Sequence, residues 1–172
     1  MSFRLQVLQA LCDVLKGVEF TVGAQTHSLA DYTDGIGHTA EKVFRGRVKY
    51  GDSDPLPMLS VLEDFKSAPV NLGSAGNTKG VLPFPLLIQG FIRDHHDHPT
   101  DPAYPFAAAT IKALLAERVD QFNILGFGNG CPSVMDIQIS TPVIRPPDGE
   151  ISAVAFFYLN VTLTLAEDFE SL

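Results

Sequence analysis

Hydrophobic and polar residues alternate along two segments near the end of the chain, which is the pattern of a strand with one buried face. The segments cover residues 134–143 and 157–165. The positions on their expected buried faces are Met135, Ile137, Ile139, Thr141 and Val143, then Phe157, Leu159, Val161, Leu163 and Leu165. Because residues 146–150 between them read Pro-Pro-Asp-Gly-Glu, we expect one long hairpin. Such a hairpin has more paired backbone than a small core requires, which indicates a sheet edge or face presented to other subunits.

Two other segments carry apolar residues three and four positions apart, which is the spacing of a helix with one buried face. They cover residues 2–16 and 106–122. Ser2 and Gly17 are suited to begin and end the first helix, and Pro105 is suited to the opening turn of the second. The residues expected to face the core are Leu5, Leu8, Leu11, Cys12 and Leu15, then Ala107, Ile111, Leu114, Leu115, Val119 and Phe122.

Three further strands are expected in the first part of the chain. Residues 44–50 alternate, with three basic side chains on one side of the strand. After a turn at 51–55, residues 57–63 are expected to return as an antiparallel partner, so that the two strands form a hairpin. Residues 84–93 form the most hydrophobic strand and carry apolar residues on both faces, which predicts a central position in the sheet.

The remaining segments are expected to be loops. Residues 23–41 lack periodicity and predict a loop or broken turns. Residues 66–82 are rich in glycine and residues 94–105 are polar, so we expect both loops to be mobile in the free subunit. Residues 1–172 have the size of a single domain. The order of the elements predicts an α+β fold, with a mainly antiparallel sheet of about five strands and the helices packed on one face.

The charge of the chain restricts the partners that we expect. With 12 basic and 20 acidic residues the formal net charge is −8, which disfavours general affinity for nucleic acid or an anionic membrane surface. No segment reaches the roughly 18 unbroken apolar residues of a membrane span, and the first residues lack the apolar core of a signal peptide. Cys12 and Cys131 have neither metal-ligand nor redox-motif spacing, which predicts reduced thiols in a soluble cytoplasmic product.

A polar segment is the candidate for metal chemistry. Residues 94–101 contain three histidines and three aspartates, namely His95, His96, His98, Asp94, Asp97 and Asp101. Imidazole and carboxylate groups together suit zinc, nickel or manganese, so a metal-dependent hydrolase that uses His95, His96, His98 and Asp101 is an alternative function. Neighbouring residues of a flexible loop need not converge, and no residues that would orient the ligands are identifiable. We therefore predict no catalytic residue, no cofactor and no bound metal.

The strongest charge feature is a row of three cations, Arg45, Arg47 and Lys49, on one side of the strand expected at 44–50. One interpretation is an ordinary solvated face, because charges on one side of an antiparallel sheet are common. The other is electrostatic pairing with acidic surface on a neighbouring subunit or partner. A net charge of −8 for each copy makes such acidic surface abundant in a homo-oligomer. These three residues are our candidate subunit or partner interface.

Four short motifs follow one another along the chain. They are Val-Phe-Arg-Gly-Arg-Val at 43–48, Asp-Pro-Leu-Pro-Met-Leu-Ser-Val-Leu-Glu at 54–63, Leu-Ile-Gln-Gly-Phe-Ile-Arg-Asp at 87–94 and Pro-Thr-Asp-Pro-Ala-Tyr at 99–104. Together with the following helix and the Pro-Asp-Gly hairpin, they resemble the tail terminator (tail completion) proteins of long-tailed bacteriophages, the lambda type among them. The resemblance covers most of residues 40–166 and rests on the order of elements and on short turn motifs.

The resemblance implies a structural virion protein without enzymatic activity. Such a subunit forms a ring, usually hexameric, at the head-proximal end of the tail tube, where it stops tube growth and gives the head connector a docking surface. The implied partners are further copies of the chain, the tail tube protein and the head–tail connector protein, with DNA passing through the lumen without specific binding. The implied location is the virion tail, after assembly in the host cytoplasm. Another neck or minor tail component of the same fold is the alternative within this class.

Overall fold

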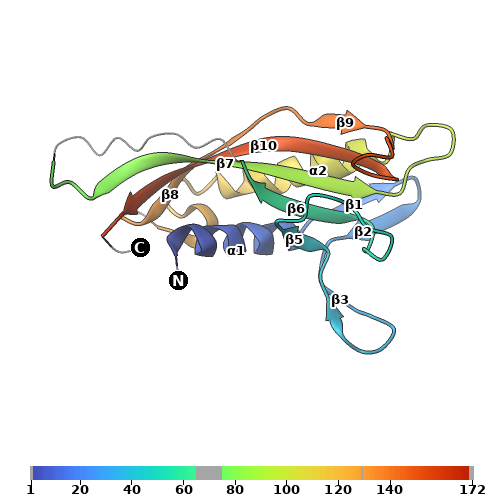
Figure 1. The fold of residues 1–172 in the computed structure, drawn as a ribbon, viewed down its shortest axis with the longest axis horizontal. Helices are drawn as coiled ribbons and strands as arrows, with labels where there is room; N and C mark the ends of the chain where they lie inside the picture. The colour runs from blue at the N-terminus through green and yellow to red at the C-terminus, as the bar shows by residue number, and fades with distance from the viewer. Residues whose placement is uncertain (1, 65–74, 129, 171–172) are drawn as a thin grey trace.

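The computed structural model describes residues 2–64, 75–128 and 130–170. Its principal elements are two α-helices and one open sheet, and both helices lie on the same side of that sheet (Figure 1). The helices are α1 (Phe3–Lys16) and α2 (Ala103–Glu117), and the strands, in spatial order, are β5 (Val43–Arg45), β6 (Met58–Glu63), β7 (Lys79–Ile92), β10 (Ala155–Asp168) and β8 (Ser133–Ile139), with β9 (Val143–Arg145) also paired with β10. The predicted α+β fold with a mainly antiparallel sheet is confirmed.

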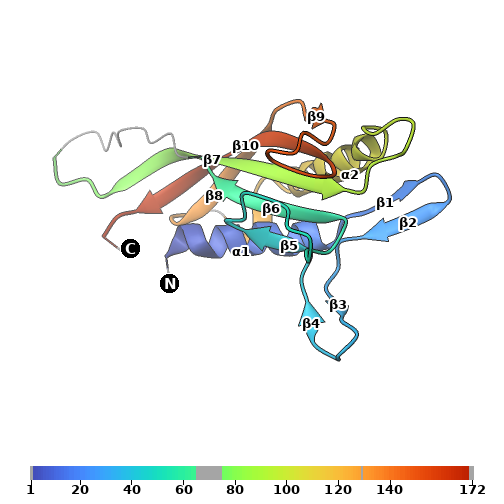
Figure 2. The ribbon, with the colours of Figure 1, turned by 45° about the vertical axis from the view of Figure 1, so that its right-hand side comes forward.

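The two longest strands form the centre of the sheet. β7 and β10 pair antiparallel along their whole length, from Ala155 opposite Ile92 to Asp168 opposite Lys79. The first residues of β7 and the last residues of β10 extend beyond both helices (Figures 1 and 2). The alternation predicted for the last strand is confirmed, because its odd-numbered residues from 157 to 165 are all buried against the helices. The prediction of a central strand at 84–93 is also confirmed, since β7 lies between β6 and β10.

The long loop predicted at 66–82 is wrong at its end. Residues 79–82 belong to β7, and residues 65–74 lie outside the described part of the chain. Glycine and proline interrupt the sequence pattern here, yet pairing with β10 continues through Gly80, Pro83 and Pro85. Pairing with the neighbouring strand β10 therefore overrides the local preference for a loop.

β5 and β6 pair in parallel, which corrects the hairpin predicted for them. The first strand ends at Arg45, because Gly46 takes a φ of +77° and turns the chain out of the sheet. The excursion from 46 to 57 then carries the chain back, so that β6 enters the sheet in the same direction as β5. Ser60 of β6 holds this excursion in place, since its hydroxyl donates a 2.6 Å hydrogen bond to the Arg47 carbonyl.

The strand predicted at 134–143 is divided into β8 and β9, which pair with successive parts of β10. A bulge opposite Thr164 and Leu165 shifts the register of β8, so that Val134 is buried and Met135 is 51% exposed. The predicted burial of Met135 is therefore wrong, and Thr141 and Val143, predicted on the same buried face, are also exposed. The hairpin itself is confirmed for β9 and β10, whose connection is closed by the Asp148 carboxylate, which accepts the N–H groups of Ile151 and Ser152.

The segment predicted as a loop at 23–41 contains the second strand of one hairpin and the whole of another. β1 (Glu19–Val22) pairs with β2 (Gln25–Ser28), and β3 (Tyr32–Thr33) pairs with β4 (Thr39–Ala40). The second hairpin projects away from the body of the molecule (Figure 2). β2, β3 and β4 are short and mostly exposed, and they carry no alternating apolar pattern. In β1, by contrast, Phe20 and Val22 alternate with polar residues.

Both helices differ from their predictions in detail. In α1 Leu5 is 40% exposed and Val7 is fully buried in its place. α2 begins at Ala103, three residues before the predicted start, because Pro105 is tolerated in a first turn. It ends at Glu117, so Val119 and Phe122, predicted to be buried, are 86% and 61% exposed. Leu115, also predicted to face the core, is 46% exposed. The predicted polar loop therefore covers residues 94–102, and its mobility stays a prediction.

The core lies between the helices and one face of the sheet. α1 and α2 contribute Leu11, Leu15, Phe106 and Leu114, all with no exposed surface. Cys12 is buried and Cys131 is exposed, and both are free cysteines. Within the described ranges no helix combines the length and the hydrophobicity needed to cross a membrane.

Replacement of Gly90 by alanine should destabilise the fold. A Cβ atom at this position would lie 2.2 Å from the Phe157 ring, so the ring and α2 behind it would have to move. We expect Gly90→Ala to lower the free energy of unfolding by about 2 kcal/mol, a typical cost of overpacking. Urea denaturation measures this difference. Gly35→Ala, where an added Cβ has open space, is the matched control; equal stability of the two variants would contradict the prediction.

Candidate functional site

The structure separates the three cations of the candidate interface. Arg45 is the last residue of β5, whereas Arg47 and Lys49 follow the Gly46 turn and lie outside the strand. They therefore do not form a row on one strand face, which corrects that part of the prediction. All three side chains are exposed and belong to one continuous segment at an outer edge of the sheet.

The three cations also differ in their partners. Arg47 forms an ion pair with Asp54 and its guanidinium lies 3.9 Å from the centre of the Phe44 ring. Phe44 packs in turn on the small cluster of Met58, Phe91 and Phe156, on the face of the sheet opposite the helices. Arg47 thus has a structural role, whereas the side chains of Arg45 and Lys49 make no hydrogen bond or ion pair within the described residues. These two charges are free to meet an external partner.

Both outer strands of the main sheet are open on one side. Among the described strands, β5 pairs only with β6 and β8 pairs only with β10. An unpaired strand edge offers backbone N–H and C=O groups to another chain. The cationic segment continues directly from one of these edges, and the opposite edge lies beside the end of α2.

A hollow of about 510 Å³ lies between the end of α2 and β8. Its lining includes three apolar side chains that are largely exposed, Leu115 at 46%, Val119 at 86% and Met135 at 51%. Arg118 and Asp136 form an ion pair at 3.1 Å on its rim. Exposed apolar side chains gathered at one place are typical of a contact surface.

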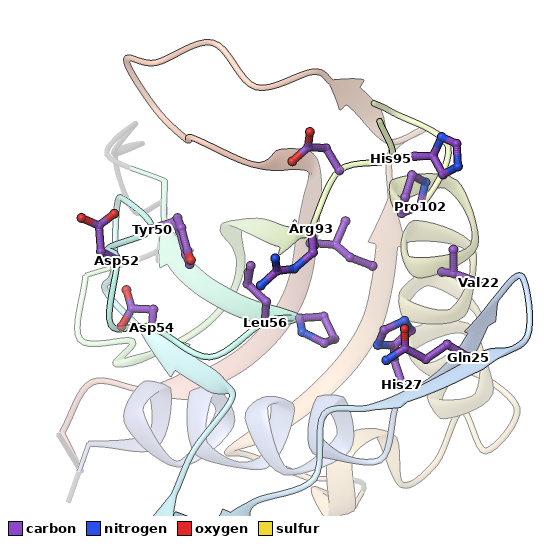
Figure 3. A pocket seen from close by; sticks show the side chains of 13 residues that line it. Val22, Gln25, His27, Tyr50, Asp52, Asp54, Leu56, Arg93, His95 and Pro102 are labelled. Carbon is purple, nitrogen blue, oxygen red and sulfur yellow. The ribbon is translucent and has the colours of Figure 1, made fainter. Parts of the chain in front are cut away.

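A larger cavity, of about 540 Å³, lies between the β1–β2 hairpin and the excursion from 46 to 57. In Figure 3 Arg93 lies between Asp52 and Asp54 on one side and Gln25 and His27 on the other. Arg93 follows the last residue of β7 and has no ion pair among the described residues. The cavity can therefore offer both signs of charge to a polar partner.

His27 of β2 also lines this cavity. Burial lowers the pKa of His27 first, and the positive charge of Lys42 lowers it further. The imidazole also stacks on the Phe20 ring, with 5.2 Å between the ring centres. The neutral form is therefore favoured, and His27 acts here as a packed aromatic residue of the hairpin.

The histidine-rich loop does not converge on a metal position. His95 Nδ1 accepts hydrogen bonds from the backbone N–H groups of Asp97 and His98, each at 3.2 Å, and so closes the loop on itself. The His95 and His98 rings stack with 5.9 Å between their centres. Across the described ranges, no group of three or more His, Cys, Asp or Glu residues is placed to hold a metal ion.

Comparison of the sequence with models of protein families gave no match, and comparison with curated proteins gave none either.

Sequence reasoning missed both the hollow and the cavity. Each is assembled from segments far apart in the chain, such as residues 22–27, 50–57 and 92–95 for the cavity. No local pattern encodes such an assembly. One sequence feature bears on the hollow. The apolar spacing of α2 continues past its end at Glu117, through Val119 to Phe122, and predicts further helix there.

The stability of the protein should rise with pH because of His27. Its lowered pKa means that the folded protein binds this proton less readily than the unfolded chain, so stability is present above the ordinary pKa of 6.5 and is lost as pH falls through the lowered value. His27→Gln should reduce this dependence of the melting temperature between about pH 5 and pH 7. His96→Gln, at an exposed position, is the control. An unchanged slope in the His27 variant would refute the assignment.

Proposed function

We propose that this protein is a structural subunit of a bacteriophage tail, a tail terminator that assembles into a ring at the head-proximal end of the tail tube. In this role the ring stops growth of the tube and provides the surface on which the head connector docks. The proposal rests on the resemblance of the sequence motifs to that family, and one structural observation carries it further. The main sheet is open, with an unpaired edge on β5 at one side and on β8 at the other.

An open sheet of this kind favours association. Edges left unpaired in a stable monomer are usually covered or made very short, and contact with another subunit is one way to cover them. β5 is short, with three residues, whereas β8 presents an edge of seven residues. Because the two edges of this subunit differ, a contact between them is of the head-to-tail type, which generates a ring when the rotation closes.

The motifs that carry the resemblance support the same proposal by their positions. The motif at 43–48 supplies β5, the motif at 54–63 supplies β6 and the motif at 87–94 supplies the end of β7. These three strands are neighbours in the sheet. The motif at 99–104 leads into α2, so the motifs meet in one part of the fold even though they are dispersed along the sequence.

The charge of the subunit is compatible with DNA passing through the lumen of the ring. A formal net charge of −8 for each copy disfavours tight binding of the phosphate backbone. The expected partners are therefore proteins: further copies of the chain, the tail tube protein and the connector protein. We place the assembled ring in the virion tail, with assembly in the host cytoplasm.

The proposal predicts a closed homo-oligomer, with a hexamer as the expected size. Native mass spectrometry over a wide range of protein concentration, with and without tube protein, measures the size of the oligomer. Labelled protein in intact virions should appear by electron microscopy at the junction of tail and head. A strictly monomeric protein in every condition would contradict the ring, and a ring located elsewhere would indicate another neck or tail component.

A further inference from the structure

The segment from Lys42 to Lys49 differs in charge from the rest of the molecule. It contains four basic residues and no acidic one, in a chain whose formal net charge is −8. Val48 is 61% exposed and stands between Arg47 and Lys49. The segment therefore presents an apolar side chain flanked by cations, at the β5 edge of the sheet.

The hollow between α2 and β8 has the complementary character. Its exposed side chains, Leu115, Val119 and Met135, are apolar. The segments that form it, residues 115–121 and 133–139, carry three acidic residues and one basic residue, namely Glu117, Asp120, Asp136 and Arg118. Arg118 and Asp136 line the hollow and pair with each other, so the net negative charge comes from Glu117 and Asp120 beside it. The hollow belongs to the opposite edge of the sheet.

We propose that residues 45–49 of one copy dock in this hollow on the next copy, an inference that rests on the proposed ring. Val48 packs against Val119 and Met135 of the neighbouring copy. The free charges of Arg45 and Lys49 face the acidic side chains around the hollow. The two surfaces lie at different edges of one subunit. Each copy therefore presents residues 45–49 to one neighbour and the hollow to the other, and the contact repeats around the ring.

The other exposed apolar projection of the molecule fits the hollow less well. Ile36, at the tip of the β3–β4 hairpin, is 78% exposed. The hairpin and its base, residues 31–41, carry three acidic residues and no lysine or arginine. Like charges would face one another if this hairpin entered the acidic hollow, which disfavours it as the occupant.

Cysteine cross-linking between two different copies tests the contact directly. One copy carries Val48→Cys and the other Val119→Cys, both in a Cys131→Ser background. Cys12 can remain, because it is buried and burial raises its pKa to about 11, which keeps it a poorly reactive thiol. After mixing and mild oxidation we expect a disulfide-linked dimer on a non-reducing gel. Val48→Cys mixed with Met135→Cys provides a second pair with the same expectation.

Two controls make the cross-link specific. Each single-cysteine copy oxidised alone should stay monomeric on the gel, because the contact joins two different surfaces. Ile36→Cys mixed with Val119→Cys should also give no dimer, although both positions are more exposed than Val48. Dimer formation by this control pair to the same extent would attribute all the cross-links to random collision and overturn the inference.

Charge reversal tests the same contact without cysteines. Arg45→Glu with Lys49→Glu should raise the concentration needed for half-assembly roughly tenfold or more, while the melting temperature of the subunit stays nearly unchanged. Asp120→Lys in the same chain, which leaves the Arg118–Asp136 ion pair intact, should recover part of the assembly. The matched control, Lys112→Glu with Arg145→Glu, makes the same change in net charge at positions outside residues 45–49 and outside the lining of the hollow, and should assemble normally.

The outcomes separate this inference from the proposed function. A ring of normal size in which neither Val119→Cys nor Met135→Cys cross-links to Val48→Cys overturns the contact and leaves the ring standing. Normal assembly of the Arg45 and Lys49 double variant overturns the electrostatic part of it. A protein that stays monomeric at every concentration overturns both the contact and the ring.

Discussion

The contact of the Phe157 ring with Gly90 is the one on which the rest of the fold depends. The two residues are opposite one another in the β7–β10 ladder, and the absence of a side chain on Gly90 leaves room for the ring. Phe106 of α2 meets this ring edge-on at 5.1 Å between centres, and Phe20 of β1 stacks on Phe106 at 4.6 Å. One glycine thus allows the sheet, a helix and a hairpin to pack as a single aromatic column.

A second interaction holds the opposite end of the molecule. The Glu167 carboxylate, at the end of β10, is 1% exposed and accepts hydrogen bonds from Arg4 Nε at 3.0 Å and Arg4 Nη2 at 2.8 Å. This pair joins the first turn of α1 to the last residues of β10. Both helices pack on one face of the sheet, and among the described strands neither β5 nor β8 has a partner on its outer side. These two edges are the surfaces that the proposed ring would use.

The candidate interface could be predicted in its residues but not in its form. Arg45, Arg47 and Lys49 are visible as a cluster of positive charge in an acidic sequence. The alternation around them predicted a strand, yet Gly46 adopts a positive φ and ends it. Which of the cations remains free depends on Asp54, seven residues beyond Arg47, and on the ring of Phe44. A local pattern carries no information on such pairing, because exposed positions are compatible with several conformations.

By itself the sequence determined the elements whose burial is periodic: α1, the body of α2, and the strand β10. For these the apolar side chains leave only one face that can turn to the core, so the pattern and the structure coincide. The tertiary structure alone decided the parallel pairing of β5 with β6, the bulge that exposes Met135, and the end of α2 that leaves Val119 in solvent. Those features depend on which distant segment supplies the neighbouring backbone and side chains, and pairing across the fold is a property of the whole chain that no short window of sequence contains.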